Sequence, residues 1–91
     1  MSGGDEEWFA PLRAKFASRL PEHRESLLAA LAADDRERLV GRAHRLAGIA
    51  GMMGSAEVGQ AALRLEEELR SDKVGDAAFA ALIDAIDRAI G

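Results

Sequence analysis

Hydrophobic residues recur along most of the chain at intervals of three and four, which is the spacing of amphipathic helices. The C-terminal half shows the pattern most regularly, first at Val58, Ala62, Leu65 and Leu69 and then at Phe79, Leu82, Ile83, Ile86 and Ile90. Residues 36–53 carry a further stripe, formed by Leu39, Ala43, Leu46, Ala50 and Met53. We therefore predict three helices here, each with one face turned to a shared core.

Residues of the capping and helix-stopping types stand between these stripes, where helix boundaries are expected. They are a break and cap at Asp34-Asp35, a stop at Gly54, a cap at Ser55, a loop over residues 71–75 and an opening residue at Asp76.

The N-terminal part is predicted to hold two more helical runs. Residues 1–4 are expected to form a disordered tail, and Asp5 to cap a helix whose apolar positions reach Leu20. Pro21 either kinks this helix or stands in the first turn of a second one, which continues to about residue 33. The predicted fold is all-α: residues 5–91 form an antiparallel up-and-down four-helix bundle with an additional N-terminal helix.

Composition narrows the class of protein further. The 91 residues suffice for one domain. The chain has no Thr and no Tyr, two residues that favour strands, so its composition favours helices over strands. The chain has no Cys, which excludes disulfides, thiolate catalysis and zinc held by cysteine. The net charge of −4 argues against a nucleic-acid partner. Neither a long apolar span nor a signal-peptide pattern is found, so we expect a cytoplasmic protein without a membrane partner.

One histidine stands among glycines in a segment that otherwise reads as helix. Gly41, Gly48 and Gly51 lie at spacings of −3, +4 and +7 from His44, on its own side of the helix. Each glycine inside a helix destabilises it by roughly 1 kcal/mol relative to alanine, so we expect these three glycines to have a specific role. The apolar stripe of this helix is centred about 130° away, which predicts that His44 faces outward into a furrow with few side chains.

An exposed imidazole is largely neutral at pH 7 and is then a competent nucleophile. No Ser/His/Asp arrangement, phosphate-binding loop or pair of metal-ligating histidines accompanies it, so a partner is expected to bring the rest of an active site. Arg42 and Arg45 flank the histidine and could supply positive charge. The remaining neighbours form a predicted docking patch: Glu37, Val40, Gly41, Gly51 and Met52.

The run from His44 to Gly54, with the helix pattern around it, resembles the histidine-containing phosphotransfer (HPt) domain of bacterial phosphorelays. It fits the family's His-x-Leu-x-Gly core, with a further Gly ten residues after the histidine. Leu63-Arg64-Leu65-Glu66 resembles the family's Leu-Glu element on the next helix. The resemblance implies that His44 accepts a phosphoryl group, that Gly48 leaves room for it and for a docking receiver domain, and that Leu46 and Gly54 are structural.

Two positions depart from the family's pattern. The family often carries Lys three residues after the histidine, where this chain has Ala47, and a small polar residue where it has Ile49. Arg45 is the expected local substitute for the missing lysine. The predicted phosphate environment is therefore Arg45, Ala47 and Gly48.

The resemblance implies a phosphocarrier and not an enzyme with an ATP site. Nε2 of His44 would take the phosphoryl group from a receiver-domain aspartate and pass it to a second one. The expected partners are a response-regulator receiver domain and a hybrid sensor kinase. The chain itself, expected to be a monomer, would hold no cofactor and no metal, because the Mg²⁺ belongs to the receiver.

Two other functions stay open on the residues alone. A helical adaptor could dock a partner through the glycine furrow without carrying phosphate, and the missing lysine favours it. A dimerising kinase fragment is the second, although it would need an ATP-binding domain.

Three further features have interpretations of their own. His23 stands among charged residues and is expected to be a solvated surface histidine. Gly59 is expected to permit close helix packing, an explanation that fits the glycines near His44 less well. The acidic run Glu66-Glu67-Glu68 is expected to be a solvated face, the alternative being a contribution of Glu66 beside His44.

Overall fold

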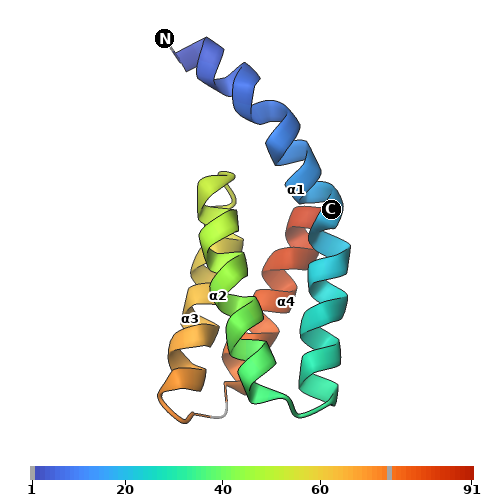
Figure 1. The fold of residues 1–91 in the computed structure, drawn as a ribbon, viewed down its shortest axis with the longest axis vertical. Helices are drawn as coiled ribbons and strands as arrows, with labels where there is room; N and C mark the ends of the chain where they lie inside the picture. Colours follow the sequence, from blue (N-terminus) through green and yellow to red (C-terminus); the bar gives the residue numbers. More distant parts are fainter. Residues whose placement is uncertain (1, 74) are drawn as a thin grey trace.

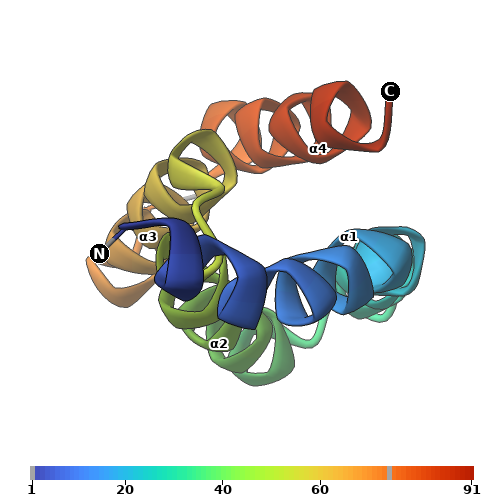
Figure 2. The ribbon, with the colours of Figure 1, turned by 90° about the horizontal axis from the view of Figure 1, so that it is seen from above.

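Four helices make up the structure, a computed structural model that describes residues 2–73 and 75–91, with side chains from Phe9 onward. They are α1 (Ser2–Ala32), α2 (Arg36–Met52), α3 (Ala56–Arg70) and α4 (Asp76–Ile90). Consecutive helices run in opposite directions (Figure 1) and surround a common centre (Figure 2). The predicted all-α bundle is confirmed.

The predicted additional N-terminal helix is wrong, because α1 continues as one helix of 31 residues through Pro11 and Pro21. A proline removes one backbone hydrogen bond and crowds the preceding turn, but it does not end a helix that is held on both sides of it. Here Phe16 and Leu20 are buried before Pro21, and Leu27 after it. The helix also includes residues 2–4, for which the sequence predicts a tail. Figure 1 shows α1 bending, its N-terminal half projecting beyond the other helices.

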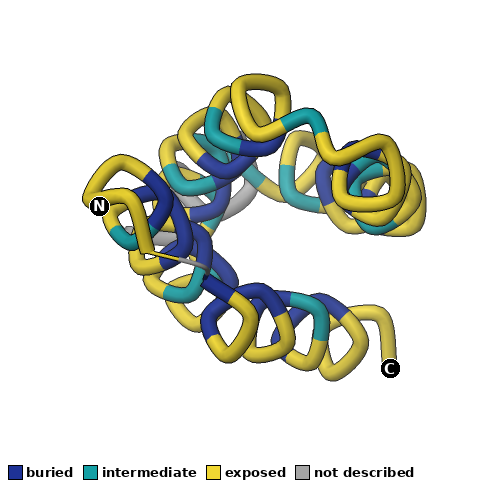
Figure 3. Tube along the Cα trace, turned by 90° about the horizontal axis from the view of Figure 1, so that it is seen from below, coloured by how far each residue is buried: buried dark blue, intermediate teal, exposed yellow. Residues whose placement is uncertain are grey.

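Each helix packs against two neighbours, in the order α1, α2, α3, α4 and back to α1. Their buried faces turn toward the centre, as Figure 3 shows. The predicted stripes of α2 and α3 are confirmed as core, with Met53 half-buried at the edge, whereas Ile90 at the end of α4 is exposed. The largest fully buried side chains are Leu20, Leu27, Leu46, Val58, Leu65, Leu82 and Ile86. In the described part of the chain, no helix combines the length and apolar character needed to span a bilayer.

Two of the predicted helix-end signals are wrong, and the others agree with the structure. Asp5, the predicted cap of the first helix, lies inside α1, which begins at Ser2. The Asp35 side chain accepts a hydrogen bond from the backbone N–H of Arg38 (3.0 Å) and so caps α2. Gly54 follows the end of α2 with a φ of +80°, a conformation that favours glycine. Ser55 occupies the N-cap position of α3, but its side chain makes no capping hydrogen bond, so its predicted role is wrong. Asp76 opens α4 as predicted.

Gly59 of α3 lies close against the backbone of α2. A Cβ atom built on it would lie 3.3 Å from the backbone nitrogen of Gly51 and 3.5 Å from the carbonyl oxygen of Ala47. The prediction that Gly59 permits close packing is thus confirmed. A Cβ on Gly41, Gly48 or Gly51 would meet nothing within 4 Å, so tight packing does not explain the glycines around His44.

This contrast predicts opposite effects of the same substitution at two glycines. Gly41→Ala should stabilise the protein by about 0.5–1 kcal/mol, because it adds helix propensity in open space. Gly59→Ala should destabilise it by about 1 kcal/mol, because overpacking against the α2 backbone outweighs the same gain. Urea unfolding of both variants measures the difference. An equal gain at both positions would show that α3 moves away from α2 at little cost.

Candidate functional site

His44 lies in the middle of α2, on the side away from the core. Its side chain is 70% exposed, whereas Ala43 and Leu46 on the opposite side of the helix are buried. The predicted outward orientation is confirmed. The ring is nevertheless held in place, because α3 supplies it with a partner.

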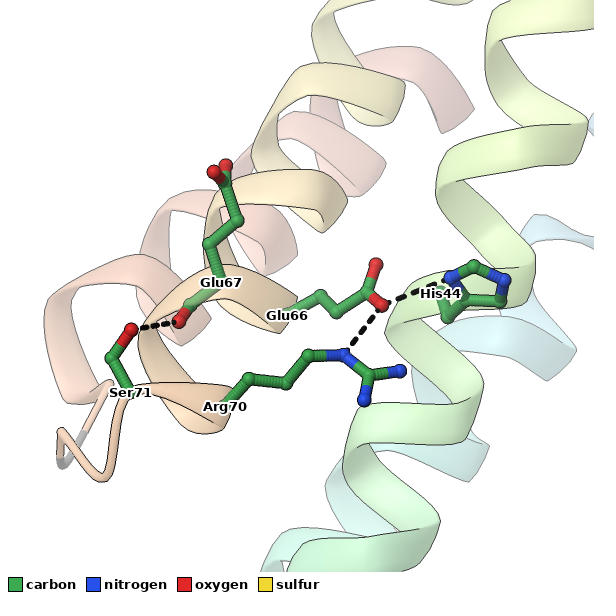
Figure 4. Close-up of polar contacts among 5 residues, drawn as sticks. All are labelled: His44, Glu66, Glu67, Arg70 and Ser71. Atoms are coloured by element: carbon green, nitrogen blue, oxygen red, sulfur yellow. Dashed lines mark hydrogen bonds and ion pairs between the residues drawn. The ribbon is translucent and has the colours of Figure 1, made fainter.

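That partner is Glu66, whose side chain is only 9% exposed. Oε2 of Glu66 lies 2.9 Å from Nδ1 of His44 and 2.8 Å from Nε of Arg70, so one oxygen serves both groups. Figure 4 shows the two side chains converging on this carboxylate, while Glu67 points away from it. A buried carboxylate needs such partners, because isolation from water otherwise disfavours its charge. Of the two interpretations of the acidic run, the structure supports the contribution of Glu66 beside His44.

The charge of Glu66 determines which nitrogen of His44 carries the hydrogen. Burial raises the pKa of Glu66, but the hydrogen bonds from Arg70 and His44 lower it by more, so the pKa lies below its ordinary value. The carboxylate is therefore ionised at neutral pH and only accepts hydrogen bonds. Nδ1 must donate, which in a neutral ring leaves the lone pair on Nε2.

A hollow of about 700 Å³ lies beside the ring, between α2 and α3. Ala47, Gly48 and Gly51 of α2 line one side of it. Leu63, an exposed apolar side chain, lines the other side with Gln60. Since Gly48 and Gly51 leave open space where side chains would stand, another protein can approach the ring closely.

The predicted docking residues lie around this hollow or next to it. Gly51 lines it directly, and Met52 is 73% exposed at the end of α2. Glu37, Val40 and Gly41 border a second hollow of about 600 Å³, which Arg70 shares with the first. The two hollows thus meet at Arg70.

Arg45, the predicted substitute for lysine, lies elsewhere. It borders two hollows that do not include His44, and α1 forms part of the larger one. Successive helical residues point about 100° apart, so being next in sequence does not bring Arg45 to the exposed edge of the ring. The cation in the hollow of His44 is Arg70.

Arg70 and Leu63 are absent from the predicted site because they belong to α3. Their approach to His44 depends on how α3 is aligned along α2. One signal was available: Glu66 lies seven residues after Gly59, and His44 lies seven residues before Gly51. Residues seven apart share a helix face, so a contact between the two glycines places Glu66 opposite His44.

Comparison with known proteins gives one family and one relative. The model of the family described as "Hpt domain" matches residues 11–90. The sensor histidine kinase GacS of Pseudomonas protegens is 33% identical over 91 residues, which are 100% of this chain and 10% of that protein. The chain therefore spans about a tenth of the length of this curated relative. No solved structure matches the chain.

The buried carboxylate predicts a specific pH dependence of stability. A carboxylate whose pKa is lower in the folded chain stabilises the fold above its ordinary pKa, and this contribution is lost as the pH falls through the folded-state pKa. Glu66→Gln should therefore be less stable than the parent protein at pH 7. The difference should shrink as the pH falls below about 4. Urea unfolding of both proteins across this range measures it.

Glu67→Gln provides the matched control, because it removes the same charge one residue away, from an exposed side chain that points away from His44. We expect its stability relative to the parent protein to change little with pH. A pH dependence as large as that of Glu66→Gln would mean that the net charge of α3, and not the contact with His44 and Arg70, is responsible.

Proposed function

The chain belongs to the Hpt domain family, whose members act in phosphorelays, and on this premise we propose that His44 carries a phosphoryl group between receiver-domain aspartates. The observation that carries the proposal is the contact between Nδ1 of His44 and the ionised, buried Glu66. It fixes the ring, leaves the lone pair of Nε2 unused and turns that nitrogen toward solvent. The chain would act in this way in the cytoplasm as a carrier without an ATP site.

In the proposed step Nε2 attacks the phosphorus of an aspartyl phosphate. The N–P bond forms, the P–O bond to the aspartate breaks, and the aspartate leaves with the electron pair as a carboxylate. The ring keeps its hydrogen on Nδ1 and becomes positively charged. Glu66 stabilises that charge through the existing hydrogen bond, which is a charge-assisted interaction with a carboxylate already in place. The reverse step returns the group to a second aspartate and restores the neutral ring.

The hollow beside the ring supports docking of a receiver domain. Its glycines let the partner's backbone approach Nε2, and Leu63 offers it an apolar contact. The partners would be a response-regulator receiver and a hybrid sensor kinase, in line with the relative that is itself named a sensor histidine kinase. The divalent cation of the reaction would belong to the receiver.

Arg70 is the group best placed to offset the charge of the phosphoryl group. A phosphoryl group adds close to two negative charges. Arg70 borders the hollow of His44, and its Nε is already 2.8 Å from the carboxylate that holds the ring. Its two terminal amino groups remain able to donate hydrogen bonds to the phosphate. Ala47 has no charge, and Arg45 lies on the flank of α2 toward α1.

Replacing His44 tests the proposal directly. When the purified chain is mixed with receiver domains carrying labelled aspartyl phosphate, the parent protein should acquire acid-labile, base-stable label. His44→Gln should acquire none and should remain folded, with a loss of stability of about 1 kcal/mol for the hydrogen bond to Glu66. His23→Gln is the matched control, since the chain has two histidines, and it should keep the label. Label that persists on His44→Gln would contradict the proposal.

The choice between the two arginines can also be tested. A charge-assisted hydrogen bond contributes about 1.5–3 kcal/mol, so Arg70→Ala should slow phosphorylation by a small-molecule phosphodonor about tenfold or more. Arg45→Ala should react more nearly like the parent protein. Ala47→Lys, which restores the lysine of the family pattern, should rescue Arg70→Ala in part. If Arg45→Ala has the larger defect, then the arginine next in sequence supplies the charge.

A further inference from the structure

The larger of the two hollows that Arg45 borders has a volume of about 480 Å³ and lies on the other flank of α2, where it packs against α1. Its apolar wall comes from both sides: Leu12 and Phe16 of α1, Ile49 of α2, and Met53 directly after α2. Leu12 is 41% exposed, and Ile49 and Met53 are only partly buried. Residues of α1 line the hollow from Leu12 to Ser26, about 21 Å at 1.5 Å per residue. It is therefore a groove about four helical turns long.

Four cations surround this groove: Lys15, Arg19, Arg42 and Arg45. Among the residues that the structure describes, none of the four takes part in an ion pair. Six other arginines do form ion pairs, on α1, α2, α3 and α4. Glu22 is the one carboxylate on the groove wall. A chain of net charge −4 thus concentrates unpaired positive charge at one place.

The pKa of His23 reflects the positive charge around this groove. Its ring packs against Phe16, with centroids 6.3 Å apart, and is partly buried, so His23 is less exposed to solvent than the sequence predicts. Burial lowers the pKa of His23, and Arg42, Arg19 and Arg45 lower it further, against the opposing effect of Glu22. The three guanidinium groups therefore act together on one point of the groove.

We propose that this groove binds an amphipathic, acidic helix of a partner protein. Two parallel helical walls with an apolar floor accept the apolar face of a third helix, and the unpaired cations on the rim match carboxylates that flank that face. The groove is long enough for about four turns. A nucleic acid fits less well, because the floor is mainly aliphatic, Phe16 is buried and the net charge of the chain repels a phosphate backbone.

This binding site is independent of the proposed phosphotransfer. It uses the α1 flank of α2, whereas His44, Glu66 and Arg70 use the α3 flank. It also assigns a role to Arg42 and Arg45, which do not border the hollow of His44. A His44→Gln protein should therefore bind the acidic helix as the parent protein does.

The test uses a fluorescent peptide of about 16 residues with Leu on one helical face and Glu on both flanks. Fluorescence anisotropy should show saturable binding that weakens as salt is added. The double variant Arg19→Glu/Arg42→Glu should bind at least tenfold more weakly. The control Arg64→Glu/Lys73→Glu, which changes the net charge equally on another face, should bind within about threefold of the parent protein. Thermal unfolding confirms that both variants are folded.

NMR on the parent protein shows where the peptide lies. Bound peptide should shift the methyl signals of Ile49 and Met53 and leave Leu63 unchanged. It should also raise the pKa of His23, because the added carboxylates offset the neighbouring guanidinium groups. The proposal is overturned if the two double variants bind alike or if Leu63 shifts instead of Ile49. It is equally overturned if a peptide with Lys in place of Glu binds as tightly, or if a single-stranded oligonucleotide displaces the acidic peptide.

Discussion

The close approach of α3 to α2 at Gly59 is the constraint on which the candidate site depends. A side chain at this position would press on the backbone at Gly51 and Ala47, so glycine is what allows the two helices to lie so near each other. The helices are antiparallel, and a step of seven residues returns to nearly the same face. Seven residues from this crossing on each helix stand His44 and Glu66, in contact at 2.9 Å. Arg36, at the start of α2, holds the far end of α3 by donating to the carbonyls of Leu69 and Lys73.

A single carboxylate oxygen then connects the two sides of the site. Because Oε2 of Glu66 accepts from both His44 and Arg70, the orientation of the imidazole and the position of the guanidinium are set by the same group. Burial alone would favour a neutral Glu66, whereas its two partners keep it charged. The ring of His44 remains exposed at its other edge, so the rigid support comes from inside the bundle and the reactive edge faces outward. Such support reduces the freedom that a nucleophile must lose when it reacts.

Sequence patterns predicted what depends on one helix at a time. The stripes of α2, α3 and α4, the cap at Asp35, the stop at Gly54 and the outward direction of His44 all follow from spacing along a single helix. Predictions that depend on how two helices pack were less complete, although Gly59 was correctly predicted to permit close packing. Pro21 could be read as a boundary because the packing of Phe16, Leu20 and Leu27, which holds α1 together across it, is not visible in the local sequence. The sequence points to Arg45 because it is next to His44 along the chain, whereas the alignment of α3 on α2, which brings Arg70 to the hollow of His44, is not visible in either helix alone.

The two flanks of α2 differ in how their charges are balanced, and this difference separates two kinds of surface. On the flank toward α3, the buried carboxylate is paired and the neighbouring cation already has a partner, which is typical of a site prepared for a small charged group. On the flank toward α1, cations surround an apolar groove without partners in the described part of the chain. Unpaired charges close together repel each other and raise the free energy of the folded chain. An acidic partner would relieve that repulsion on binding, so the same α2 helix can present a reaction site on one flank and a recognition site on the other.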